Sequence, residues 1–81
     1  MDKVQILQKV TSVFQDVLDD DDIKLSDQTV ASDVDDWDSL NHIQIIVGIE
    51  KIFKIKFTST EIHQFKNVGE LINAIEHKLK S

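Results

Sequence analysis

The sequence predicts an all-α fold: a four-helix bundle with three longer helices, a short third helix, and a long loop between helices one and two. Apolar residues recur at helical spacing in three stretches, and about twenty residues after the first stretch show no sustained period. Capping patterns mark the starts of the short third helix and of the last helix. Because 81 residues supply one modest core, we expect a single domain over residues 1–81.

The first helix is expected at residues 3–18, where apolar residues three, four and one apart form one stripe. Asp2 and Gln5 have the spacing of a helix cap. The stripe consists of Val4, Leu7, Val10, Phe14, Val17 and Leu18.

Residues 19–38 form a connection long enough to indicate a function. Four apolar residues are expected to hold it against the core, namely Ile23, Leu25, Val30 and Val34. The four aspartates from Asp19 to Asp22 lack the central glycine and alternating ligands of a calcium loop, so we expect no specific metal site.

The second helix is expected at residues 39–53, with an apolar arc broad enough for burial on more than one side. Core packing is the default interpretation for Leu40, Ile43, Ile46 and Val47. Gly48 costs this helix about 1 kcal/mol relative to alanine, which indicates a close contact with a neighbouring helix.

Two shorter patterns predict the remaining helices. Thr58 and Glu61 have capping-box spacing and open a short helix that runs to about Phe65. Asn67 and Glu70 repeat that spacing before a last helix that ends near residue 80.

Charge is concentrated in one part of the chain. Between residues 16 and 38 there are ten Asp and one Lys, a balance of −9, whereas the remainder has five acids and eight Lys, a balance of +3. Such a field favours basic protein partners and disfavours nucleic acid. The sequence lacks a signal-peptide pattern, cysteine and any run near roughly 18 apolar residues, so we expect a cytoplasmic monomer that does not insert into membranes.

Residues 35–40 read Asp-Asp-Trp-Asp-Ser-Leu and place one hydroxyl, that of Ser39, where the acidic loop becomes an apolar helix. A nucleophilic serine needs an oriented base and an oxyanion hole. His42 lies three residues on, but no nucleophile-elbow glycines flank the serine, so we expect a covalent attachment point and no catalytic residue. The alternative is that Asp38 and Ser39 only cap the helix.

The neighbouring residues also carry expectations. Asp35, Asp36 and Asp38 would repel a phosphate held close to the backbone, so a phosphodiester on Ser39 should project outward. Trp37 is expected to fix the loop to the core through its apolar surface. His42 is expected as a solvated surface residue that is able to touch a phosphate.

Helix order, loop length and the motif Asp38-Ser39-Leu40 together resemble the acyl carrier proteins over essentially the whole chain. Trp37 before the motif and residues 41–43 after it are more similar to discrete carriers of specialised acyl or polyketide-type pathways than to housekeeping fatty-acid carriers. By this resemblance Ser39 would bear a 4'-phosphopantetheine arm, which a phosphopantetheinyl transferase takes from coenzyme A with the help of Mg²⁺.

The resemblance also implies partners and the residues that meet them. They would include an acyl-loading ligase or acyltransferase and ketosynthase-type or other acyl-processing enzymes. The expected docking residues are Asp35, Asp36, Asp38, Leu40, Gln44, Val47 and Glu50, and the acyl-pocket candidates are Leu40, Ile43, Ile46 and Val47. Helix two differs from the housekeeping pattern because its acidic signal is confined to its start.

Two alternatives stay open on sequence alone. One is an acidic helical interaction domain without a carrier role, and the other is a peptidyl or D-alanyl carrier. Asp-Ser-Leu favours the acyl class, and neither the cargo nor the pathway follows from the sequence.

Overall fold

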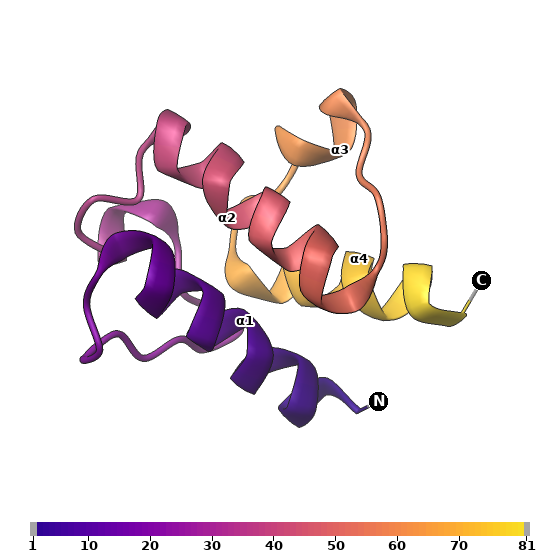
Figure 1. The fold of residues 1–81 in the computed structure, drawn as a ribbon, viewed down its shortest axis with the longest axis horizontal. Helices are drawn as coiled ribbons and strands as arrows, with labels where there is room; N and C mark the ends of the chain where they lie inside the picture. The colour runs from indigo at the N-terminus through magenta and orange to yellow at the C-terminus, as the bar shows by residue number, and fades with distance from the viewer. Residues whose placement is uncertain (1, 81) are drawn as a thin grey trace.

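Four α-helices follow one another in the computed structural model, which describes residues 2–80 (Figure 1). They are α1 (Lys3–Leu18), α2 (Ser39–Phe53), α3 (Ser59–Ile62) and α4 (Val68–Lys80), and a short 3₁₀ turn, Ala31–Asp33, lies in the long loop. The all-α bundle predicted from the sequence is confirmed, with α1 in contact with both α2 and α4. In Figure 1, α3 lies beyond α2 as seen from α1.

Capping side chains define where the helices begin. Asp2 and Gln5 form a reciprocal capping box at α1, and Asp38 accepts the Asn41 N–H at the start of α2. Thr58 and Glu61 form the predicted box at α3, and Asn67 Oδ1 accepts the Glu70 N–H at the start of α4. Each cap provides an acceptor for a backbone donor that has no partner within its helix.

The third helix is shorter than predicted, since it ends at Ile62 and not near Phe65. A tighter turn, in which the Gln64 N–H donates to the Glu61 carbonyl at 3.1 Å, closes it. Phe65 then packs edge-on against Phe57, with ring centroids 5.7 Å apart. Phe65 therefore lies outside the helix and contacts Phe57.

The core lies among α1, α2 and α4 and includes Ile23 from the loop. Two expectations about it are wrong. Val4 is 64% exposed, whereas Ile6 and Val13 are buried, so the buried face of α1 is rotated relative to the predicted stripe. The buried residues are Ile6, Val10, Val13, Phe14, Ile23, Ile45, Ile46, Ile49, Phe53, Val68, Leu71, Ile72 and Ile75.

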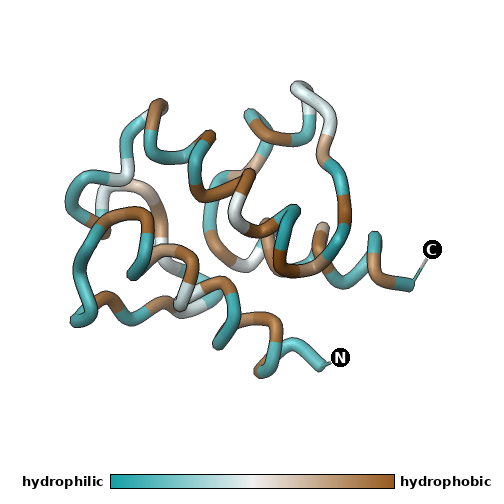
Figure 2. The backbone as a smooth tube through the Cα atoms, in the orientation of Figure 1, coloured by the Kyte–Doolittle hydropathy of each residue, from teal (hydrophilic) through white to brown (hydrophobic). Residues whose placement is uncertain are grey.

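The second error concerns α2, along whose whole length apolar residues recur (Figure 2). Ile46 is buried as expected, but Leu40 is 69% exposed, and Ile43, Val47 and Ile52 are exposed as well. Among residues 2–80, no element covers these four side chains. The broad arc therefore supplies one buried face and one exposed apolar face.

Gly48 of α2 allows the close helix contact predicted for it. A Cβ atom at this position would lie 2.9 Å from Cγ1 of the buried Val13 on α1. Such a distance is shorter than packed carbon atoms tolerate, so a side chain larger than hydrogen would push the two helices apart.

The long loop is fixed at several points. Ile23 is buried, Leu25, Val34 and Trp37 pack against the core, and Val30 is half-buried.

Backbone hydrogen bonds attach the same loop to α4. The carbonyls of Asp27 and Thr29 accept the N–H groups of Gly69 and Val68, both at 2.9 Å. A Cβ on Gly69 would lie 2.8 Å from the Asp27 carbonyl oxygen, so the bare Cα permits this approach. The loop thus satisfies the first donors of the last helix. No helix within residues 2–80 has the length and apolarity to cross a bilayer.

Candidate functional site

Ser39 is the first residue of α2, and it is exposed. The cap of this helix is Asp38, whose Oδ1 accepts the Asn41 N–H at 2.8 Å. The Ser39 hydroxyl makes no hydrogen bond to any other residue between 2 and 80. Ser39 therefore does not cap the helix, because Asp38 alone fills that role.

The backbone before Ser39 has an unusual conformation. Asp36 has φ of 67°, in the left-handed region that aspartate tolerates better than most residues. Its carbonyl accepts both the Asn41 side-chain amide at 2.7 Å and the Asp38 N–H at 3.0 Å. Sequence reasoning missed this role of Asn41, which fixes the turn that presents Ser39.

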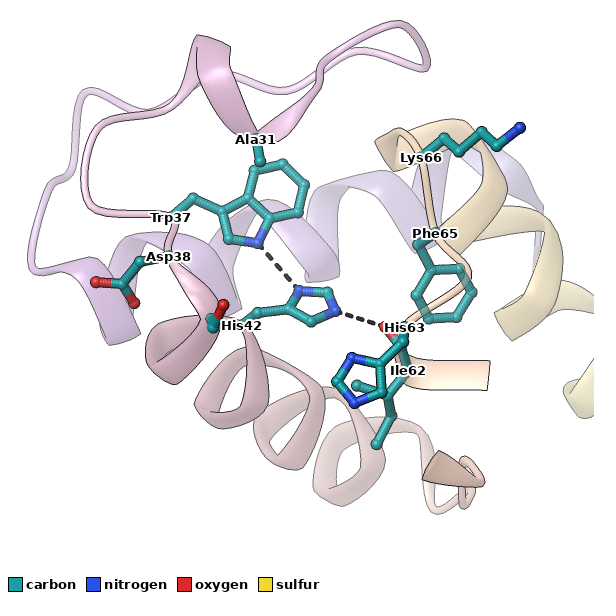
Figure 3. Close-up of a pocket in the computed structure, with 9 residues that line it drawn as sticks. Ala31, Trp37, Asp38, His42, Ile62, His63, Phe65 and Lys66 are labelled. Atoms are coloured by element: carbon teal, nitrogen blue, oxygen red, sulfur yellow. Dashed lines mark hydrogen bonds between the residues drawn. The ribbon is translucent and has the colours of Figure 1, made fainter. Parts of the chain in front are cut away.

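His42 is not the solvated surface residue that the sequence suggested. Its Nδ1 accepts the Trp37 indole N–H at 3.1 Å, and its Nε2 lies 2.9 Å from the Ile62 carbonyl oxygen (Figure 3). Since Nδ1 is an acceptor, Nε2 carries the proton and donates to Ile62. Both ring nitrogens are occupied, so His42 is not placed to act as a base for Ser39.

Trp37 fixes the loop to the core, as predicted. Its ring packs edge-on against Phe14 of α1, with centroids 4.8 Å apart, and lies 6.0 Å from the ring of His42. Ring contacts continue from His42 to Phe65 at 6.5 Å and from there to Phe57. A series of aromatic rings therefore connects α1, through the start of α2, to the segment after α3.

A cavity of about 310 Å³ lies beside Ser39. The residues around it come from the loop, the start of α2, and α3 with the segment that follows; they are Ala31, Trp37, Asp38, Ser39, His42, Ile62, His63, Phe65 and Lys66. In Figure 3, Asp38 and Lys66 lie at opposite ends of the cavity, and the Lys66 amine points away from it. Figure 3 also shows the Asp38 carboxylate pointing away from the cavity, so the two charged residues stand at opposite ends of its lining with their charged groups turned outward.

The predicted docking residues are mostly exposed. Asp35, Asp36 and Asp38 precede an apolar strip formed by Leu40, Ile43 and Val47, with Gln44 beside it, and all of these are exposed. Leu40, Ile43 and Val47 are three and four residues apart, so they lie on neighbouring turns of one face of α2.

Glu50 differs from the other docking candidates because it is half-buried. Its Oε2 accepts the Phe57 N–H at 2.8 Å, which gives it a structural role at the end of α2. None of the acyl-pocket candidates lines the cavity beside Ser39, since Leu40, Ile43 and Val47 are exposed and Ile46 lies in the core.

An ion pair connects α3 to α4. Lys78 Nζ lies 3.0 Å from Oε2 of Glu61 and 3.1 Å from its Oε1, and the Thr58 N–H donates to Oε1 at 2.8 Å. The Thr58 N–H first, and then the Lys78 ammonium, lower the pKa of Glu61 below its ordinary value of 4.5. Within residues 2–80, no group of three or more His, Cys, Asp or Glu side chains is arranged to hold a metal ion.

Comparison with known proteins agrees with this arrangement. The family model described as a phosphopantetheine attachment site matches residues 8–75. A curated acyl carrier protein of Thermotoga maritima is 25% identical over 75 residues, which cover 93% of each chain. The solution structure of a holo acyl carrier protein from Geobacter metallireducens superimposes with a TM-score of 0.85 and 44% identity, over 93% of this chain and 86% of the other.

Proposed function

Because this chain belongs to the acyl carrier protein family, whose members bear a 4'-phosphopantetheine group, we propose that Ser39 is the residue to which that group is attached. The protein is a carrier of acyl groups and not an enzyme. The cap on α2 gives the most direct support for Ser39 as the attachment residue. Since Asp38 caps the helix, the Ser39 hydroxyl is exposed and without a partner among residues 2–80, and it is free to form a phosphodiester.

The residues around Ser39 fit such a group. Its hydroxyl stands beside an open cavity, and the three carboxylates before it lie on the loop side. When bound, phosphopantetheine supplies the terminal thiol that holds an acyl group as a thioester. The chain itself contains no cysteine, so the thiol comes entirely from this group.

Attachment requires a base from outside this chain. The Ser39 oxygen forms the new bond to the β-phosphorus of coenzyme A, the bond between the two phosphates breaks, and adenosine 3',5'-bisphosphate leaves. The serine proton must go to a base on the transferase, since both nitrogens of His42 are engaged.

Members of the family interact with phosphopantetheinyl transferases and acyl-processing enzymes. We propose that Asp35, Asp36 and Asp38 attract the basic surface of the transferase and that the exposed Leu40 and Val47 enter an apolar pocket on a partner. Gln44 lies beside that strip. Glu50 contributes less, because its carboxylate already accepts the Phe57 N–H.

The proposal includes the enzymes that load and use the carrier. An acyl-loading ligase or acyltransferase would supply the cargo, and a ketosynthase-type or other enzyme would consume it, in the cytoplasm. Entry of an acyl chain beside Ile46 stays a prediction, as does the single-domain organisation over residues 1–81.

The decisive experiment is a modification assay read by intact mass. The protein is incubated with coenzyme A, Mg²⁺ and a broad-specificity transferase, and it should gain one phosphopantetheinyl group. Ser39→Ala should abolish the gain without changing the melting temperature. Ser59→Ala is a matched control, because Ser59 is also an exposed first residue of a helix that its predecessor caps. A mass gain that survives in Ser39→Ala would overturn the assignment.

A further inference from the structure

The wall of the cavity beside Ser39 is built from three chain segments that hydrogen bonds hold together. Trp37 from the loop donates to His42 on α2, and His42 donates to the Ile62 carbonyl at the end of α3. Contacts of Trp37 with Phe14 and of His42 with Phe65 fix the two rings from either side. Because the ring nitrogens of Trp37 and His42 already have hydrogen-bond partners, the two side chains should keep these positions and leave the cavity open.

Charge around the cavity is unequal. Asp35, Asp36 and Asp38 precede Ser39 in the chain. Of the three, Asp38 lines the cavity, and Lys66 lies at the opposite end from it (Figure 3). Lys66 is exposed and makes no ion pair or hydrogen bond within residues 2–80. A phosphodiester on Ser39 carries one negative charge, so it is repelled from the loop side and attracted toward Lys66. In the present structure the Lys66 amine points outward, and its flexible four-carbon stem allows it to turn back.

The size and lining of the cavity also restrict what it holds. About 310 Å³ is at the low end of the range of roughly 300–1,000 Å³ for small-molecule sites. Trp37, Ile62 and Phe65 offer apolar surface, and His63 adds an imidazole at the rim. These features suit a short anionic group followed by a compact apolar one. A long acyl chain needs more room.

We propose that the phosphopantetheine arm does not swing freely from Ser39 but rests its first half in this cavity. The phosphate faces Lys66, and the dimethyl-bearing carbon, which follows the phosphate ester oxygen and one methylene, packs against Trp37 and Phe65. The cysteamine end, with its acyl group, lies beyond the cavity. The inference depends on the proposed attachment at Ser39, and it adds Lys66, Trp37 and Phe65 as residues that bind the arm.

Trp37 is the only tryptophan of the chain, so the cavity contains its own spectroscopic reporter. Apo and holo proteins would be prepared by transferase treatment and compared by ¹H–¹⁵N correlation spectra and by acrylamide quenching of Trp37 emission. In the holo protein we expect shifts of the Trp37 indole N–H and of the amides of residues 62–66. We also expect nuclear Overhauser contacts from the arm's methyl groups to the rings of Trp37 and Phe65, and a reduced quenching constant.

Lys66→Gln tests the electrostatic part. This variant should lose most of the protection of Trp37 in the holo form, whereas Lys9→Gln, which removes an exposed lysine of α1 outside the cavity, should keep it. If mass spectrometry shows the arm attached but no methyl-to-ring contacts appear and quenching is unchanged, the arm is free in solvent and the inference is overturned. If no mass is gained at all, the proposed attachment itself fails.

Discussion

His42 is expected to contribute more to stability than a half-buried histidine normally does. Replacing it with alanine removes the acceptor of the Trp37 N–H and the donor to the Ile62 carbonyl, each worth about 1 kcal/mol. Lost ring contacts with Trp37 and Phe65 add about 0.5 kcal/mol. The free energy of unfolding should therefore fall by roughly 2–3 kcal/mol, which for a domain of this size lowers the melting temperature by roughly 10–20 °C.

Two shorter replacements separate the two hydrogen bonds. Asparagine at position 42 places an amide oxygen near the position of Nδ1, so it keeps the bond from Trp37 and loses the bond to Ile62. Glutamine reaches the position of Nε2 and does the opposite. Each variant should be about 1 kcal/mol more stable to unfolding than His42→Ala. Only His42→Asn should return the indole N–H resonance of Trp37 to its wild-type chemical shift.

Urea unfolding and thermal melts measure the free energies, and long-range ¹H–¹⁵N spectra of the wild type report the tautomer. We expect a proton on Nε2 of His42 and none on Nδ1 at neutral pH. The reasoning is refuted if His42→Ala costs less than about 0.5 kcal/mol, the usual range for a surface substitution. Protonation of Nδ1 in the neutral ring would contradict the assigned direction of the bond from Trp37.

Gly48→Ala should destabilise the protein by about 1 kcal/mol in urea unfolding, because overlap with Val13 outweighs the helix-propensity gain. Glu61→Gln should lower stability at neutral pH, and thermal melts against pH should show the gap to wild type closing as the pH falls below 4.5. Because the folded-state pKa is lowered, the ionised carboxylate stabilises fully above its unfolded-state pKa, and this contribution is lost as the pH falls through the folded-state pKa. Asp38→Asn keeps the cap but removes a charge, so kcat/KM for modification by the transferase should fall while the melting temperature changes little.

Each of these predictions has a contrary result. A more stable Gly48→Ala protein would mean that α1 moves away at no cost, and Gln44→Ala, on the exposed side of the same helix, controls for propensity alone. In a Lys78→Met background the Glu61 effect should shrink but persist, since the Thr58 N–H remains. Equal modification rates for Asp38→Asn and wild type over a range of salt would remove that carboxylate from transferase recognition.

Helix positions follow from the sequence because their signals are local. The spacing of apolar residues and the caps at Asp2, Asp38 and Thr58 act within a few positions along the chain, and they place α1 and α2 correctly. Ser39 could be singled out for the same reason, since acid, hydroxyl and apolar helix are adjacent. Only the structure shows that Ser39 does not cap α2, because both Asp38 and Ser39 are residue types that cap helices.

Tertiary contacts could not be predicted from the sequence. Leu40 and Ile46 belong to the same apolar arc, and only the position of α1 decides that the first is exposed and the second buried. His42 meets a carbonyl twenty residues further on, at Ile62, which no spacing rule connects to it. The cavity beside Ser39 is lined by both His42 and Ile62, so it could not be predicted from the sequence.

The attachment of the loop to α4 has a consequence for the newly made protein. The carbonyl of Asp27 accepts the Gly69 N–H and that of Thr29 accepts the Val68 N–H, so the loop between α1 and α2 completes its backbone bonding only when the last helix has formed. On the ribosome those donors emerge about forty residues later than the carbonyls they serve. The middle of this loop should therefore reach its final geometry late in synthesis, once the first residues of α4 are in place.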